Sequence, residues 1–179
     1  LLYSMANLAK FLPASAHRSM SSIRTEGIEI GGVRFLELRD VAALQKRAFK
    51  PRLAYSFSTL LLLWSLPFVR FLVARENGEI VGCAIGDRNG DQARVVNICV
   101  DPAAQRRGIG ARLLRALDAA LPLGDMVLMV EAENATAKAL YLREGFQESG
   151  VSRNYYGRNL DGVWMLKTRD GSSATKIRI

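Results

Sequence analysis

The chain has 179 residues, of which 49% are hydrophobic and 23% charged, and its formal net charge is +8. This length suits one domain with a buried core, and the composition is that of an ordinary globular protein. No apolar run approaches the ~20 residues of a membrane-spanning helix, and more than half of the positive excess lies in the two ends. We therefore expect no membrane partner and no specific nucleic-acid partner.

The first half of the chain predicts one strand, two helices and a β-hairpin. Asn77-Gly78, flanked by apolar residues, is the strongest short-range hairpin signal in the sequence. Asp40 is placed to cap the first helix, and Pro51 is expected to end it. The predicted elements are a strand over Val33–Leu38, helices over Asp40–Phe49 and Ser56–Leu66, and strands over Arg70–Glu76 and Glu79–Asp87.

The second half alternates strands with amphipathic helices. Leucines and Ile109 recur at helical spacing between residues 109 and 121, which gives one apolar face. The predicted elements are strands over Ala93–Val100, Met126–Val130, Phe146–Arg153 and Val163–Lys167, and helices over Ile109–Leu121 and Asn134–Gly145. This order predicts a single α/β domain with a mixed sheet.

We expect residues 22–168 to form this domain. Residues 1–21 are expected to be a poorly ordered extension and residues 169–179 a C-terminal tail. Leu1–Phe11 resembles a weak signal sequence, but it lacks a basic stretch ahead of it, and Lys10 interrupts it. We therefore expect a cytoplasmic protein, as a monomer or a homodimer.

Two cysteines, Cys83 and Cys99, lie inside predicted strands among apolar neighbours. A secreted protein would more often carry several paired cysteines, so both are interpreted as reduced, buried thiols. The single histidine, His17, lies in the N-terminal extension, far along the chain from either cysteine. This distribution argues against Cys–His nucleophilic catalysis and against histidine-ligated zinc, so no metal is expected.

The stretch between the predicted strand ending at Val100 and the following helix contains a candidate phosphate-binding loop. The free N–H groups of a helix N-terminus attract anions, and Gly108 and Gly110 let a phosphate approach the backbone closely. Arg106 and Arg107 add charge-assisted hydrogen bonds. The loop is neither a Walker loop nor a dinucleotide fingerprint, and a glycine turn that merely opens a helix stays an alternative.

Four ordered motifs resemble the GNAT family of N-acetyltransferases over about residues 33–167. Gln105-Arg-Arg-Gly108-Ile-Gly110 is similar to the family's pyrophosphate loop, and Asn97–Pro102 to the strand before it. Glu131–Phe146 resembles its Asn…Ala-Leu-Tyr…Gly-Phe element, and Arg153-Asn-Tyr-Tyr156 the closing motif of its ribosomal-protein-alanine N-alpha-acetyltransferase branch. The resemblance implies a mostly antiparallel sheet flanked by about four helices, and acetyl transfer from acetyl-CoA to a primary amine.

The resemblance also implies roles for individual residues. Backbone groups of one strand would pair with the pantetheine arm, and the loop would hold the pyrophosphate. Asn134 would contact the arm, and Tyr141 would protonate the departing thiolate. A helix cap at Asn134 and sheet packing of Tyr141 are the structural alternatives. The implied cofactor-binding residues, besides Asn134, are Ile98, Cys99, Val100, Arg106, Arg107, Gly108, Ile109, Gly110 and Ala111.

The sequence departs from the branch at the general base. Members usually carry a glutamate where this chain has Met129, which cannot accept a proton. Glu131 lies two residues further along the same predicted strand and should point to the same face. Our hypothesis is that Glu131 deprotonates the incoming ammonium, directly or through water; the alternative is a solvated charge at a strand end.

Tyr155 and Tyr156 resemble the aromatic pair at the acceptor entrance of this branch. Lys50–Phe57 would form the opposite wall, and its positive charge would favour an acceptor with acidic residues beyond its amine. The expected partner is a peptide or protein N-terminus, with ribosomal proteins among the candidates. A small-molecule amine, or a non-catalytic sensor of acetyl-CoA, which Met129 supports, are the alternatives. Nucleic-acid binding through the charged ends is a further one.

Overall fold

The computed structural model describes residues 23–25, 27–122 and 124–169. Two short 3₁₀ helices, Phe35–Glu37 and Pro102–Ala104, accompany the regular elements. The strands and α-helices in chain order are β1 (Ile23–Thr25), β2 (Ile28–Gly32), α1 (Leu38–Ala48), α2 (Phe57–Ser65), β3 (Arg70–Glu76), β4 (Glu79–Asn89), β5 (Gln92–Val100), α3 (Ile109–Ala120), β6 (Met126–Glu131), α4 (Ala135–Arg143), β7 (Gln147–Ser152) and β8 (Gly162–Lys167).

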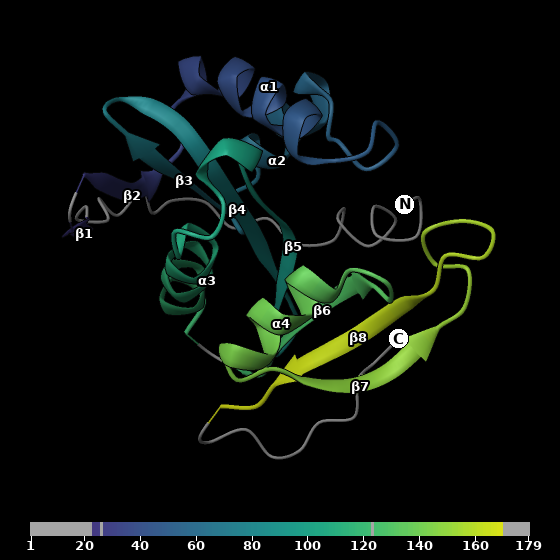
Figure 1. Cartoon of the computed structure of the whole chain (residues 1–179). Helices are drawn as coiled ribbons and strands as arrows, with labels where there is room; N and C mark the ends of the chain where they lie inside the picture. Colours follow the sequence, from purple (N-terminus) through teal and green to yellow (C-terminus); the bar gives the residue numbers. More distant parts are fainter. Residues whose placement is uncertain (1–22, 26, 123, 170–179) are drawn as a thin grey trace.

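Eight strands of the described chain form one sheet in the order β1-β2-β3-β4-β5-β6-β8-β7. Within these strands β5 and β6 are the one parallel pair, and the other neighbours run antiparallel. Helices α1 and α2 cover one face of the sheet, and α3 and α4 cover the other (Figure 1). The predicted α/β domain, with a mixed, mostly antiparallel sheet and four flanking α-helices, is confirmed for these residues.

Each face of the sheet has its own apolar core. Leu113 and Leu117 of α3 are completely buried against one face, and Leu44 of α1 and Leu60 of α2 are completely buried against the other. The helical spacing of apolar residues therefore marks the faces that the sequence predicts. The two cores fix the sheet between the helices. They therefore also fix the positions of the side chains at the centre of the sheet.

The first predicted strand, Val33–Leu38, is wrong. The strand lies earlier, at Ile28–Gly32, and the chain then turns through a 3₁₀ helix into α1. The Glu37 carboxylate stabilises this turn, because its Oε2 accepts the Arg34 backbone N–H at 2.6 Å and its Oε1 accepts Nε of Arg75 at 2.7 Å. Apolar and polar residues alternate over this short segment, which is the pattern that predicted a strand. In the structure Leu36 is 83% exposed, so the pattern does not mark a buried face.

The other predicted elements are present, with ends that differ by a few residues at most. At the predicted hairpin turn both Asn77 and Gly78 have positive φ, 51° and 88°, as a two-residue turn between twisted strands requires. Ser56 caps α2, because its Oγ accepts the Thr59 N–H at 3.2 Å. None of the described helices has the length and apolar character needed to cross a membrane.

Only part of the predicted domain ends belongs to the residues that the structure describes. Residues 1–21 and 170–179 lie outside the described residues. Arg169, the first residue of the predicted tail, is described, and its backbone N–H donates to Oδ1 of Asp125 at 3.2 Å.

Candidate active site

The site is built where β5 and β6 separate. The two strands pair only at Ala93–Val95 with Met126–Leu128, although both continue further. Beyond Val95 no described strand pairs with the β6-facing edge of β5. The backbone N–H and C=O groups on this edge therefore remain available as far as the carbonyl oxygen of Val100, which accepts from Nε2 of Gln105 at 3.2 Å. An extended ligand can therefore bind along this edge as an additional strand.

A β-bulge at Val96 produces this separation. Ile85 pairs with Asn97 and Gly86 with Val95, which leaves Val96 as the extra residue of β5. Such a residue bends the strand and reverses the faces of the residues that follow it. Gly86 permits the distortion, because a Cβ atom there would lie 2.7 Å from the carbonyl oxygen of Arg94.

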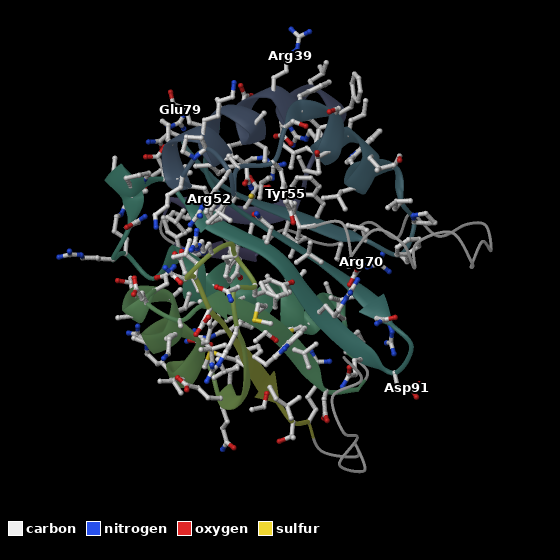
Figure 2. All side chains as sticks on the ribbon, turned by 90° about the vertical axis from the view of Figure 1, so that its right-hand side faces the viewer. Arg39, Arg52, Tyr55, Arg70, Glu79 and Asp91 are labelled. Atoms are coloured by element: carbon white, nitrogen blue, oxygen red, sulfur yellow. The ribbon has the colours of Figure 1, made fainter. Side chains whose placement is uncertain are left out.

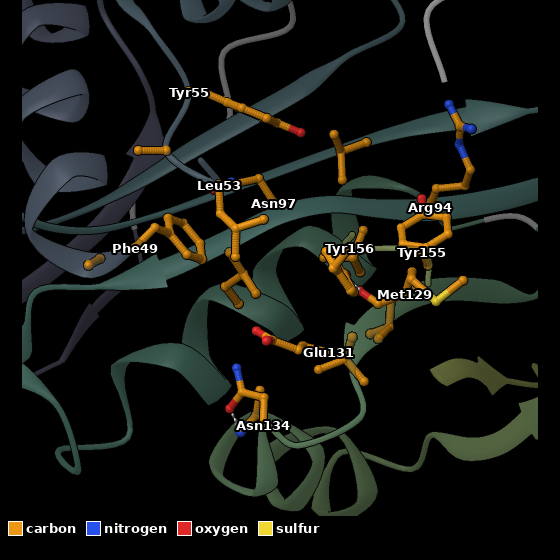
Figure 3. A pocket seen from close by; sticks show the side chains of 18 of the residues that line it. Phe49, Leu53, Tyr55, Arg94, Asn97, Met129, Glu131, Asn134, Tyr155 and Tyr156 are labelled. Atoms are coloured by element: carbon orange, nitrogen blue, oxygen red, sulfur yellow. Dashed lines mark hydrogen bonds between the residues drawn. The ribbon is translucent and has the colours of Figure 1, made fainter. Parts of the chain in front are cut away.

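A cavity of about 580 Å³ opens at the separation. Its walls come from β5, β6, α4, the segment between α1 and α2, and the segment between β7 and β8 (Figure 3). Figure 2 shows Arg52 and Tyr55 between the layer of α1 and α2 and the C-terminal half of the chain. The cavity thus lies between two parts of the domain that are far apart in sequence.

Six of the predicted catalytic, cofactor-binding and substrate-binding residues line this one cavity. They are Ile98, Glu131, Asn134, Tyr141, Tyr155 and Tyr156. Cys99 and Val100 lie further along the unpaired edge of β5, where their backbone was expected to act. The Cys99 side chain itself is buried on the α1 face, with its Sγ 3.5 Å from Sγ of Cys83. Both cysteines are free thiols, as the sequence indicated.

The predicted phosphate loop precedes α3. Gly108 has φ of 77°, and an added Cβ would meet nothing within 4 Å, so this glycine provides both the turn and open space. Ile109, Gly110 and Ala111 form the first turn of α3, whose N–H groups have no partner within the helix. Gly110 also allows close packing, because a Cβ there would lie 3.3 Å from Cδ2 of Leu140.

The two arginines of the loop differ. Arg107 forms a bidentate pair with Glu76 of β3, with Nη1 2.9 Å from Oε2. This contact lowers the pKa of Glu76 and occupies the Arg107 guanidinium. Within the described residues the side chain of Arg106 has no such partner, so it is the freer of the two to contact a phosphate.

Glu131 and Met129 both point into the cavity from β6, as strand alternation predicts. The Glu131 side chain is 12% exposed, and its Oε1 lies 3.4 Å from Nζ of Lys50 and 3.8 Å from Nη2 of Arg52. Two cations from the segment between α1 and α2 thus approach the carboxylate. Met129 packs against Gly162 of the neighbouring strand, where a Cβ would lie 2.5 Å from its Sδ.

Tyr141 lies on α4 and packs edge-to-face on Phe146, with ring centroids 5.8 Å apart. Burial raises the pKa of Tyr141 well above its ordinary value, so its phenol stays protonated at neutral pH and can donate a proton. Asn134 caps α4, because its Oδ1 accepts the Ala137 N–H at 3.0 Å. Tyr141 thus packs in the core and Asn134 caps a helix, as the structural alternatives required, and both residues also line the cavity.

The aromatic pair divides into an anchored ring and an accessible one. The Tyr156 hydroxyl donates to the carbonyl oxygen of Met129 at 2.9 Å, and burial raises the pKa of Tyr156. Tyr155 is 49% exposed and packs edge-to-face on Tyr156 and Trp164, at centroid distances of 5.0 and 6.3 Å. Tyr155 is thus free to contact a ligand, while Tyr156 fixes the segment that carries it.

Sequence reasoning missed three polar residues, of which two line the cavity and one is buried behind its wall. Gln45 is completely buried and reaches from α1 to Asn97 of β5, with Nε2 2.7 Å from Oδ1 of Asn97. Asp87 and Arg94 pair across the β4–β5 hairpin at the far end of the cavity. Pairing the residues on either side of the Gly90-Asp91 turn could have placed Asp87 opposite Arg94. Nothing in the sequence indicates the β-bulge that orients the two side chains toward the cavity.

The described residues contain no group of three metal-ligating side chains arranged to hold a metal ion. Their donor set is instead that of an organic ligand with a phosphate end: a free strand edge, a helix N-terminus and an unpartnered arginine. These features fit the pantetheine arm and pyrophosphate of acetyl-CoA.

Comparison with known proteins agrees with this geometry. Residues 67–148 match the acetyltransferase (GNAT) domain family. The chain is 36% identical over 139 residues to the N-alpha-acetyltransferase RimI of Mycobacterium tuberculosis, covering 74% of this chain and 86% of that protein. The crystal structure of the ribosomal-protein-S18-alanine N-acetyltransferase from Escherichia coli aligns with a TM-score of 0.72 and 29% identity, over 85% of this chain and 99% of that one.

A further similar structure was solved with a ligand. YncA from Salmonella typhimurium, with its cofactor acetyl-CoA, aligns with a TM-score of 0.67 and 22% identity, over 85% of this chain and 99% of that one. At this identity the likeness concerns the fold alone. Family match, sequence identity and fold together lead to one conclusion: the chain belongs to the GNAT family of acetyltransferases.

Proposed function

We propose that the protein transfers the acetyl group of acetyl-CoA to the N-terminal α-amine of a peptide or protein. One observation carries the proposal: a candidate base, Glu131, and a candidate acid, Tyr141, line the same cavity at the free edge of β5. Relatives named N-alpha-acetyltransferase and ribosomal-protein-S18-alanine N-acetyltransferase support an α-amine acceptor. A ribosomal protein is one candidate acceptor.

On the donor side, the backbone of Ile98, Cys99 and Val100 would align the pantetheine arm. The first turn of α3 and the side chain of Arg106 would hold the pyrophosphate, and Asn134 would contact the arm near α4. These groups fix the thioester carbonyl in one orientation, which lowers the entropic cost of the attack. Acetyl-CoA supplies the activated acyl group, and the chain supplies its position.

On the acceptor side, Glu131 would take one proton from the incoming ammonium, directly or through water. The amine nitrogen then forms a bond to the acetyl carbon as the carbon–sulfur bond breaks. Tyr141 would give a proton to the departing sulfur, and the second proton that the nitrogen loses on becoming an amide would return to the Tyr141 oxygen, directly or through water. The products are then an acetamide and the free thiol of coenzyme A. Lys50 and Arg52 would pair with Glu131 before the acceptor binds, and the arriving ammonium would replace them as its partner.

The aromatic wall favours a peptide over a small amine. The exposed ring of Tyr155, beside Trp164, can pack on a peptide backbone that has one wet side. A small-molecule amine would need fewer such contacts. A non-catalytic sensor of acetyl-CoA, suggested by Met129, would bind the thioester without passing the acetyl group on. The cytoplasmic location and the monomeric or dimeric state stay predictions.

The test is thiol release from acetyl-CoA by the purified chain, with N-terminal peptides and small amines as separate acceptors. We expect peptide-dependent release at rates well above hydrolysis. Release with small amines alone would replace the proposed acceptor, and tight acetyl-CoA binding without release to any acceptor would favour the sensor.

A further inference from the structure

The end of the cavity away from Glu131 holds a cross-strand ion pair. Arg94 of β5 donates from Nε to Oδ1 of Asp87 at 2.8 Å and from Nη2 to Oδ2 at 2.6 Å. Both residues line the cavity, and the two are direct partners in the β4–β5 ladder. Figure 3 shows Arg94 beside Tyr155, apart from Glu131 and Asn134.

The two members of this pair are unequally accessible. The Asp87 side chain is 6% exposed and both of its oxygens accept from Arg94, whereas the Arg94 side chain is 27% exposed. Within the described chain Nη1 of Arg94 has no hydrogen-bond partner. A guanidinium has five donors, so the edge of Arg94 that Asp87 does not use can bind a second carboxylate. The ion pair therefore offers N–H donors of Arg94 to the cavity, while both Asp87 oxygens are already occupied as acceptors.

The surroundings of Arg94 favour binding of a ligand carboxylate, in addition to the contribution of the ion pair to the β4–β5 hairpin. Tyr55 and Tyr155 line the same cavity as Arg94, and the Arg94 side chain is largely buried, which strengthens a charge-assisted hydrogen bond. Asp87 holds the guanidinium in one orientation, so little entropy is lost when a ligand binds. By contrast, Lys50 and Arg52, the cations that the sequence suggested for acidic acceptors, both approach Glu131.

Distance along β5 selects the part of an acceptor that can reach Arg94. At ~3.3 Å per residue, the Cα atom of Arg94 lies roughly 13 Å from that of Ile98, whose backbone would help to fix the thioester carbonyl, and the long arginine side chain shortens the gap that an acceptor must span. In a peptide, the carboxylate of the second residue lies roughly 6–8 Å from the N-terminal nitrogen. The α-carboxylate of a free amino acid is much closer to its own amine and would not span this distance.

We propose that Arg94 determines acceptor specificity by binding the carboxylate of an aspartate or glutamate at the second position of the peptide. This assignment rests on the proposed function, since it requires an α-amine of a peptide as the acceptor. It orders the acceptors by their second residue: acidic first, then the neutral amide, and basic last. A basic side chain would meet the guanidinium and could not reach the occupied oxygens of Asp87.

The experiment compares kcat/KM for three peptides that differ only at the second residue: Ala-Asp, Ala-Asn and Ala-Lys followed by one common sequence. We expect the wild-type chain to prefer aspartate over asparagine by about 10–100-fold, as for a charge-assisted hydrogen bond in a partly desolvated site. The preference should weaken with added salt.

Two variants assign this preference to Arg94. Asp87→Asn/Arg94→Gln replaces the ion pair with a neutral one, so that no buried charge is left alone, and it should reduce the ratio to about two or less. Arg88→Gln is the control, because Arg88 is adjacent to Asp87 in β4 and lies outside the cavity, so its replacement removes an arginine charge nearby and leaves the ion pair intact. Arg88→Gln should keep the wild-type ratio. Thermal unfolding checks that both variants are folded.

Each outcome has one meaning. Equal kcat/KM for the three peptides, or a wild-type ratio that persists in the double variant, would overturn the assignment of Arg94 and leave the proposed function standing. Failure to acetylate the α-amine of any of the three peptides would overturn both.

Discussion

Gln45 and Asn97 exchange hydrogen bonds between α1 and the strand that carries the bulge. Nε2 of Gln45 lies 2.7 Å from Oδ1 of Asn97, and Nδ2 of Asn97 lies 3.3 Å from Oε1 of Gln45. The same Oε1 atom accepts the backbone N–H of Tyr55 at 3.4 Å. One buried amide thus connects the helix, the floor of the cavity and the wall opposite β6.

Gln45→Leu should lower the free energy of unfolding by about 1–3 kcal/mol. The change removes the partners of Asn97 and of the Tyr55 N–H, and buried polar groups without partners are costly. Urea unfolding measures the loss. Lys46→Ala, at the next and exposed position of α1, is the control and should stay within about 0.5 kcal/mol of wild type. Equal stability of Gln45→Leu and wild type would contradict the structural role.

Glu131→Gln should lower kcat by about 10²–10⁴, because an amide cannot accept the proton of the ammonium. The peptide KM should change much less, since the side chain keeps its shape. Glu133→Gln, at an exposed position two residues further on, is the control and should retain wild-type turnover. Unchanged turnover of Glu131→Gln across the pH range would remove Glu131 from the mechanism.

Tyr141→Phe should lower kcat by about 10²–10⁴ and leave the fold intact, because the ring still packs on Phe146. The loss should be larger with acetyl-CoA as the acetyl donor than with an activated acetyl thioester, whose leaving group needs no proton. Steady-state kinetics with both donors separates these cases. Equal losses with both donors would indicate that the hydroxyl acts on packing and not as the acid.

Tyr141 and Tyr156 also predict how stability depends on pH. Burial raises the pKa of both phenols in the folded state, so above pH ~10 the unfolded chain releases protons that the folded chain keeps. Stability should therefore be constant with respect to these groups below pH ~10 and fall as the pH rises beyond it. Urea unfolding between pH 8 and 11 measures this, and Tyr141→Phe should make the fall shallower. A stability that rises above pH 10 would contradict the burial argument.

Arg106→Gln should raise the KM for acetyl-CoA several-fold with little change in kcat, because it removes a charge that is free to meet the pyrophosphate. Arg107→Gln is the comparison, since its guanidinium is already paired with Glu76. The larger effect at Arg106 should shrink as ionic strength increases. Equal KM values for the two variants at every salt concentration would show that the backbone of the loop, and not Arg106, carries the binding.

The sequence predicted the helices and strands after residue 50, because the apolar spacing and the Asn77-Gly78 turn are both local signals. It failed at Val33–Leu38, where the ion pair of Glu37 with Arg75 of β3 is a contact between distant residues. The same reason explains the site. Motif positions led to Glu131, Asn134 and Tyr141, whereas the buried Gln45 and the exposed edge of Arg94 depend on the bulge and on packing between elements.

Transfer to an N-terminal α-amine is tested by locating the acetyl group on the product. The purified chain is incubated with acetyl-CoA and a peptide that carries both a free N-terminus and an internal lysine, and the product is sequenced by mass spectrometry. We expect one acetyl group on the α-nitrogen, and no product when that nitrogen is blocked beforehand. Acetylation of the lysine side chain in both the free and the blocked peptide would contradict this expectation.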